Sequence, residues 1–166
     1  EIQFQGQDID TGEPRFRFTV NGRPIWLQGA GLAPFEGLTH CWRPERAQRL
    51  IELAEGAGMN LLRVWGDGDM PAEPFYDACD RQGILVWQDF MFGYGMYPDE
   101  DAAYLDNVRA EAEGIIRRLR NHPSLLLWVG GNENYMAYDF AHGGTPTVGR
   151  RIFEEILPEV CERLDP

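Results

Sequence analysis

Residues 61–90, LLRVWGDGDMPAEPFYDACDRQGILVWQDF, contain two apolar segments separated by an amphipathic one. The apolar runs 61–65 and 84–87 are short and nearly continuous, which is typical of strands that are buried on both faces. Between them, Phe75 and Cys79 lie four positions apart, on one face of a predicted helix. This succession predicts two parallel strands joined by a helical crossover.

The same strand and helix pattern extends over most of the chain. It predicts four strand-helix units in series, because each apolar run is followed by a segment with helical periodicity. The first helix is expected to begin at Pro44 and end near Gly58, with an apolar inner face. The predicted strands are 25–27, 61–65, 84–89 and 125–129, and the other predicted helices lie around 75–79, from about 99 to 120 and from about 147 to 164.

A β-hairpin is predicted ahead of these units. Phe16, Phe18 and Val20 alternate with polar residues, and the dipeptide Asn21-Gly22 is suited to a tight turn. We interpret residues 1–14 as the exit from a preceding domain and residues 15–166 as part of a single catalytic domain.

Two α/β architectures are compatible with this order of elements. A doubly wound nucleotide-binding sheet would need a glycine-rich turn after its first strand, but residues 29–34 (GAGLAP) have proline in place of the third glycine. A (β/α)8 barrel is therefore favoured. Since a complete barrel has eight units and typically about 250 residues, we predict the first half of a TIM barrel.

The composition limits the classes of partner and cofactor. A net charge of −12 argues against nucleic acid or an anionic membrane surface as the main partner. All fifteen basic residues are arginines, so neither a Schiff-base lysine nor a Walker-type phosphate loop is present. The three cysteines lack CxxC spacing and the histidines lack ligand spacing. We expect a neutral substrate, no metal and no organic cofactor, and no cellular location is inferred.

Polar and aromatic residues follow the apolar part of three predicted strands. In a parallel barrel the loops at the carboxyl ends of the strands form the active face, so these side chains should converge on one mouth. Strand ends also become polar simply because they meet solvent, but this combination is dense enough to favour a binding site. The expected mouth residues are Arg63, Trp65, Gln88, Asp89, Asn132 and Glu133.

This set of side chains suits the chemistry of sugars. Aromatic rings such as Trp65, Phe92 and Tyr135 can pack against the apolar face of a sugar ring. Carboxylates and amides can bind its hydroxyl groups, and a carboxyl group can transfer a proton to or from the glycosidic oxygen.

Several long sequence segments resemble the β-mannosidase branch of glycoside hydrolase family 2. The fourth-strand segment, from Trp128 to Glu133, is similar to that family's tryptophan-to-Asn-Glu motif. The resemblance extends from about Phe16 to the end of the chain. The other segments are LRVWG (62–66), FYDACD (75–80), GILVWQDFMF (83–92), MYP (96–98) and RLRNHPS (118–124).

The resemblance implies roles for individual residues. Glu133 matches the general acid/base, and Asn132 matches the amide that binds the sugar 2-hydroxyl. Arg63, Trp65 and Asp89 match residues that line the pocket for the terminal mannose. The family's nucleophile follows the seventh strand, so no residue of this chain is given that role. The chain departs from the family at Asp67, where glycine is usual, and at Gly131, where asparagine is common.

We therefore expect a retaining β-glycosidase that acts on β-mannosides. The alternatives are a β-glucosaminidase, a β-glucuronidase or an endo-acting mannosidase of the same fold, a catalytically silent sugar-binding barrel, and a half-barrel that serves as an assembly module. The expected partners are a carbohydrate substrate, the remaining half of the barrel and preceding β-sandwich domains. By itself the 166-residue chain is expected to self-associate and to be inactive, because its sheet would have unpaired edges.

Overall fold

The chain forms two sheets in the computed structural model, which describes residues 2–7, 11–34, 42–136 and 149–166. The first sheet is antiparallel with strand order β1-β2-β3, and the second is parallel with order β4-β5-β6-β7. The strands are β1 (Ile2–Gln7), β2 (Pro14–Val20), β3 (Arg23–Ile25), β4 (Gly29–Leu32), β5 (Leu61–Val64), β6 (Leu85–Asp89) and β7 (Leu125–Val129).

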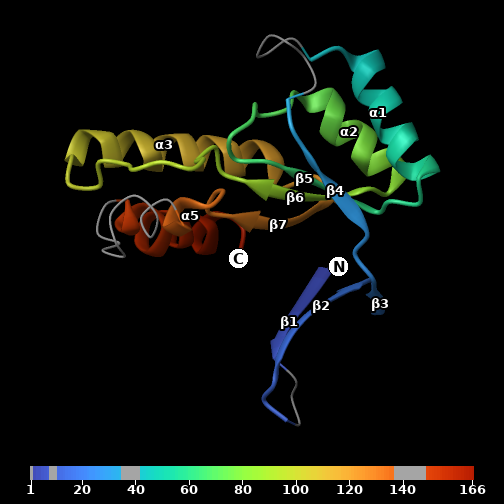
Figure 1. The fold of residues 1–166 in the computed structure, drawn as a ribbon, viewed down its shortest axis with the longest axis horizontal. Coiled ribbons are helices and arrows are strands. Elements are labelled where there is room, and N and C mark those ends of the chain that lie inside the picture. The colour runs from blue at the N-terminus through green and yellow to red at the C-terminus, as the bar shows by residue number, and fades with distance from the viewer. Residues whose placement is uncertain (1, 8–10, 35–41, 137–148) are drawn as a thin grey trace.

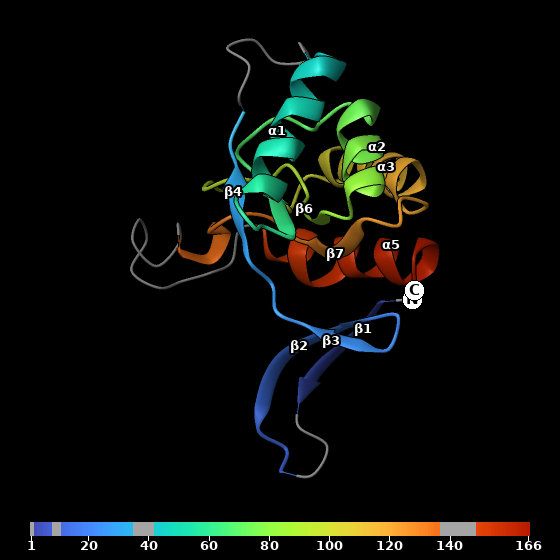
Figure 2. The same cartoon turned by 90° about the vertical axis from the view of Figure 1, so that its right-hand side faces the viewer.

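Helices follow the parallel strands, and the antiparallel sheet projects away from them (Figure 1). A view turned by 90° shows the same separation, with the helices grouped beside the parallel sheet and the hairpin below it (Figure 2). No described helix is long and apolar enough to span a membrane. The helices are α1 (Pro44–Gly56), α2 (Glu73–Gln82), α3 (Ala102–Leu119) and, at the end of the chain, the π-helical turn η1 (Ile152–Ile156) continuing into α5 (Leu157–Leu164).

The parallel sheet confirms the predicted first half of a (β/α)8 barrel. Its four strands are adjacent in the order in which they occur along the chain, and each is followed by a helix, as in a barrel wall. Two apolar clusters fix the helices to the strands. One joins α1 and α2 to β5 and β6 around Ile51 and Phe75, and the other joins α3 and α5 around Ile116 and Val160.

The first barrel strand is not where the sequence pattern placed it. We predicted a strand at 25–27, but the parallel strand is Gly29–Leu32, and Trp26 is 84% exposed. Of the two glycines in this strand, Gly29 is needed for close approach to β5, whereas Gly31 has open space around it. A Cβ on Gly29 would overlap the carbonyl group of Leu61 in the neighbouring strand. Glycine in a strand often marks such an approach.

The predicted hairpin is present and has a third strand. Asn21 and Gly22 both have positive φ, 51° and 75°, as a tight hairpin turn requires. The additional strand β1 pairs with β2, so residues 2–7 belong to this sheet. The Phe16 ring lies 6.2 Å from that of Trp87 in β6, which links the hairpin to the barrel strands. The proposed domain boundary between residues 14 and 15 stays a prediction.

Local interactions explain where α3 begins and why the geometry of the final helix changes. The predicted start of α3 near Asp99 was early, because the Asp101 side chain caps the helix by accepting from the backbone N–H groups of Ala103 and Tyr104. In the final helix the Leu157 N–H donates to the Ile152 carbonyl, the spacing of a π turn. This turn lies directly before Pro158, which has no N–H to donate.

His122 ties the start of β7 to helix α2, at the opposite end of the sheet from the strand C-termini. Its Nδ1 lies 2.7 Å from Asp80 Oδ2, and its Nε2 lies 3.2 Å from Glu73 Oε2. Partial burial by itself lowers the pKa of His122. The hydrogen bonds and negative charges of Asp80 and Glu73 together outweigh that effect and raise the pKa above its usual value.

This raised pKa predicts that His122 stabilises the fold in a pH-dependent way. The contribution of the charged imidazole is fully present below about pH 6.5, the pKa of an unfolded histidine, and is lost as pH rises through the higher pKa of the folded state. We expect His122→Asn to cost about 1 kcal/mol more at a pH of about 5.5 than at about 8.5. Calorimetric unfolding of the full-length protein would measure this, and an equal loss at both pH values would contradict it.

Candidate active site

The carboxyl ends of β5, β6 and β7 bring three predicted site residues together. Arg63 lies in β5 opposite Trp87 of β6, and Asp89 ends β6 opposite Val129 of β7. Asn132 follows β7 in the next loop. Because the strands are parallel and in register, these side chains lie at one edge of the sheet, as predicted.

Arg63 and Asp89 form an ion pair across neighbouring strands. Arg63 Nη2 donates to Asp89 Oδ2 at 2.6 Å and Arg63 Nε donates to Oδ1 at 3.1 Å, so the guanidinium contacts both carboxylate oxygens. The Asp89 side chain is fully buried, whereas that of Arg63 is 32% exposed. Two-point pairing of this kind is stronger and more directional than a single hydrogen bond.

Two further donors complete the surroundings of Asp89. The backbone N–H of Gly66 donates to Oδ2 at 3.1 Å, and the indole N–H of Trp87 donates to Oδ1 at 3.0 Å. The Trp87 ring also lies 5.6 Å from Arg63 Cζ, within cation–π range. A buried carboxylate is tolerated only when its oxygens are hydrogen-bonded, and these contacts meet that need.

Asn132 connects this pair to the loops after β5 and β6. Its Oδ1 accepts a hydrogen bond from Arg63 Nη2 at 3.0 Å, and its Nδ2 donates to Asp67 Oδ2 at 2.9 Å. Its backbone N–H donates to the Phe92 carbonyl at 2.8 Å. Asn132 is 8% exposed, so its position is fixed by several contacts at once.

Glycine allows the loops around Asn132 to pack closely. A Cβ on Gly66 would lie 2.7 Å from the Phe92 carbonyl oxygen, and one on Gly131 would lie 2.5 Å from the same oxygen. Gly131 also has φ of 154°, a conformation that side chains rarely permit. Gly131, where asparagine is common in the family, therefore fits the close approach of this loop to Phe92.

Glu133 follows Asn132 at the beginning of the next helical turn. Its φ of 54° lies in the left-handed region, which is uncommon for residues other than glycine. Such conformations are found disproportionately at functional sites, where the surrounding structure enforces them. The residue is exposed and lines a surface hollow together with Tyr135 and Phe153. Glu133 is thus an accessible carboxyl group beside a rigidly held amide.

The predicted aromatic residues have different surroundings. Trp65 lies one residue beyond β5 with a half-buried ring, and its backbone carbonyl accepts from Gly68 N–H at 3.0 Å. Phe92 and Tyr135 both make edge-on contacts with Phe153. Tyr135 remains 44% exposed, so it offers ring surface near Glu133, whereas Phe92 supports the loop.

Gln88 does not belong to the mouth where we placed it. The side chains of a strand alternate between its two faces, so the neighbour of Asp89 points toward the helices. Gln88 is fully buried and accepts a hydrogen bond from the Tyr76 hydroxyl of α2 at 2.7 Å. Its side-chain N–H donates to the Asp89 carbonyl at 2.8 Å, so it supports the end of β6 from behind.

Two residues of the network were not predicted. Trp87 lies two positions before Asp89, and strand alternation could have placed it on the same face. Asp67 was noted only as a departure from the family pattern, and its contact with Asn132 required the three-dimensional structure.

A possible metal-ligand group lies elsewhere in the described chain. Asp77, Asp80 and His122 place ligand atoms within 4.8 Å of one another. Asp80 already accepts hydrogen bonds from His122 and from the Ser124 backbone N–H, so its oxygens are used in the fold. We assign no metal to this group.

Comparison with known proteins gives similar β-mannosidases. The chain is 39% identical to "Beta-mannosidase B" of Aspergillus clavatus over 96% of its length, and 44% identical to "Beta-mannosidase" of Rattus norvegicus over 76%. These matches cover 20% and 14% of the two relatives, so the chain spans about a fifth or less of their length.

A solved β-mannosidase structure is also similar to this chain. The crystal structure of Beta-D-Mannosidase from Dictyoglomus thermophilum superposes with a TM-score of 0.89 at 40% identity, covering 99% of this chain and 20% of that one. The model of the family "Glycosyl hydrolases family 2, TIM barrel domain" matches residues 15–143. This match covers most of the chain, including the strand ends described above, and the chain therefore belongs to glycosyl hydrolase family 2.

Proposed function

We propose that this chain is the first half of the catalytic barrel of a retaining β-glycosidase that cleaves β-mannosides. The observation that carries the proposal is the position of Glu133, an exposed carboxyl group next to an amide held by the Arg63–Asp89 pair. The β-mannosidase names of similar proteins support the choice of substrate. The remaining half of the barrel and preceding β-sandwich domains are proposed to lie in the same longer protein.

Glu133 is proposed to act in both steps of the reaction. In the first step its carboxyl group protonates the departing glycosidic oxygen while a carboxylate from outside this chain attacks the anomeric carbon. In the second step the Glu133 carboxylate removes a proton from the attacking water, and the glycosyl-enzyme bond breaks. Two inversions at the anomeric carbon give a product that retains the β configuration.

Arg63, Trp65, Asp89 and Asn132 are proposed to form the sugar-binding pocket. In this proposal Asn132 binds a hydroxyl group of the sugar, and Trp65 contributes ring surface. Asp89 already accepts four hydrogen bonds from protein groups, so we propose that it acts mainly by holding Arg63 in position. A panel of aryl β-mannosides, β-glucosaminides and β-glucuronides, tested on the full-length protein, would identify the substrate class.

Removing Glu133 should affect substrates according to their leaving groups. Glu133→Ala should slow cleavage of a mannobiose by about 10²–10⁴-fold, because an alkoxide leaving group needs the proton. It should slow the glycosylation step of a dinitrophenyl β-mannoside much less, and the glycosyl-enzyme should accumulate. Steady-state and burst kinetics would measure both effects. Glu162→Ala, which removes an exposed carboxylate of α5, is the control. An equal loss of rate by Glu133→Ala on both substrates would contradict the role of general acid.

Removing the charge of Asp89 should impair both the site and the fold. Asp89→Asn keeps the size of the side chain but leaves Arg63 without its counter-ion. Breaking a fully buried pair costs about 3–5 kcal/mol, and the loss here should be smaller because the Arg63 side chain is 32% exposed. We expect kcat/KM to fall by at least about 100-fold and the unfolding temperature to fall as well. Asp106→Asn, which alters an exposed carboxylate of α3, is the matched control. A folded Asp89→Asn protein with unchanged kinetics would show that the pair does not hold the site.

A further inference from the structure

The side-chain amide of Asn132 is held by protein groups at both of its polar atoms. Arg63 Nη2 donates to Oδ1 at 3.0 Å, and Nδ2 donates to Asp67 Oδ2 at 2.9 Å. The two partners come from β5 and from the loop that follows it, whereas Asn132 lies 65 residues beyond Asp67. One loop therefore sets the orientation of a side chain that belongs to another.

The two contacts exclude the flipped amide. A guanidinium only donates hydrogen bonds, so it requires the amide oxygen, and an ionised carboxylate only accepts them, so it requires the amide nitrogen. In the flipped orientation the Asn132 NH2 group would face Arg63 and its oxygen would face Asp67. The terminal torsion of asparagine is otherwise broad, and such partners are what define it.

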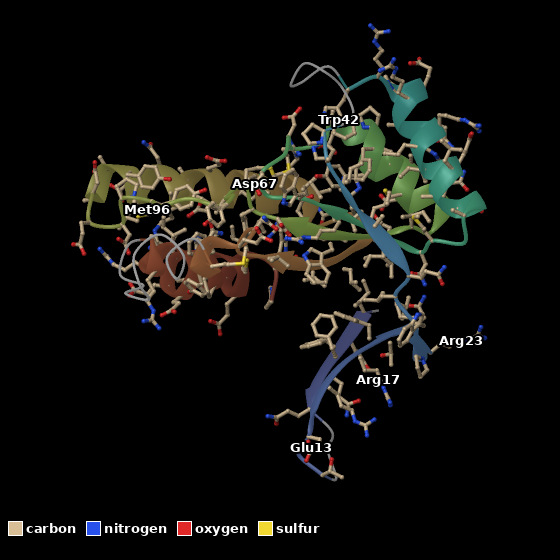
Figure 3. The ribbon with its side chains drawn as sticks, in the orientation of Figure 1. Glu13, Arg17, Arg23, Trp42, Asp67 and Met96 are labelled. Carbon is tan, nitrogen blue, oxygen red and sulfur yellow. The ribbon has the colours of Figure 1, made fainter. Side chains whose placement is uncertain are left out.

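The carboxyl group of Asp67 occupies space that is open because residue 93 is a glycine. This carboxyl group lies directly over Gly93, where any Cβ would overlap it. Asp67 is exposed to solvent, so its charge is not forced into the interior. Figure 3 shows Asp67 beside the parallel sheet, well separated from the hairpin residues Glu13, Arg17 and Arg23. Asp67 thus lies in the loop after β5, at the edge of the sheet that carries the candidate site.

We propose that Asp67 is a positioning residue that orients Asn132 toward the substrate. The amide nitrogen carries two hydrogens, and Asp67 accepts one of them, so the other is available for a substrate hydroxyl group. Because Asp67 is charged, this hydrogen bond is stronger than one between neutral groups. The inference rests on the proposed function, in which Asn132 binds the sugar.

The proposal predicts energetic coupling between Asp67 and Asn132 in catalysis. In the full-length protein, Asp67→Ala should lower kcat/KM for an aryl β-mannoside about tenfold, in line with the loss of one hydrogen bond to a charged group. In an Asn132→Ala background the same change should have almost no further effect. Asp67→Asn should restore part of the activity, because its side-chain carbonyl can accept the same N–H.

Asp69→Ala is the matched control for removing a carboxylate from this loop. Asp69 accepts a hydrogen bond from the Trp42 indole N–H, on a different part of the loop. The effects of Asp69→Ala and Asn132→Ala on kcat/KM should therefore add. If the effects of Asp67→Ala and Asn132→Ala also add, Asp67 acts independently of Asn132 and the proposal is wrong.

A second measurement does not depend on activity. In a crystal structure of the full-length Asp67→Ala protein, we expect the Asn132 amide to turn about its bond to Arg63, so that Nδ2 leaves its present position or the side chain occupies two conformers. An Asn132 side chain that keeps its position and its single conformer would overturn the proposal. If the protein hydrolyses no glycoside of the panel, the proposed function fails, while this crystal structure still decides the role of Asp67.

Discussion

The ion pair between the partly exposed Arg63 and the buried Asp89 is the interaction on which the candidate site depends. Asp89 is fully enclosed at the end of β6, and its charge is stable there because Arg63, Gly66 and Trp87 donate to it. Arg63 also donates to Asn132, the residue before Glu133. The exposed carboxyl group that we propose as the acid/base is therefore positioned by a charge pair on the two preceding strands.

The backbone around this pair leaves little freedom for the loops. The Phe92 carbonyl accepts the Asn132 backbone N–H at 2.8 Å, and Gly66 and Gly131 approach the same carbonyl so closely that a side chain at either position would clash. Three loops thus meet around one oxygen atom. Function is commonly carried on loops that a rigid scaffold positions, and here the scaffold is the parallel sheet with its helices. The left-handed conformation of Glu133 lies at the end of this constrained segment.

Sequence patterns predicted the parts of the structure that depend on burial and strand direction. Alternating apolar strands and amphipathic helices were enough to predict the half-barrel, and the rule for strand ends brought Arg63 and Asp89 together. The first strand was misplaced because Gly29–Leu32 has the composition of a turn, and the approach to β5 that explains Gly29 is visible only in the structure. Gln88 was misassigned because strand alternation was not applied. The contact of Asp67 with a residue 65 positions away has no local signal.

The role of Glu133 is the central claim, and the configuration of a rescue product tests it most directly. Azide needs no deprotonation, so it can attack the glycosyl-enzyme of a full-length Glu133→Ala protein when an activated aryl β-mannoside is supplied. Proton NMR of the product reads the anomeric configuration. If Glu133 is the acid/base, the nucleophile is intact and the product is the β-mannosyl azide. An α-mannosyl azide would identify Glu133 as the nucleophile, and a folded variant without rescue would contradict both its catalytic role and this account.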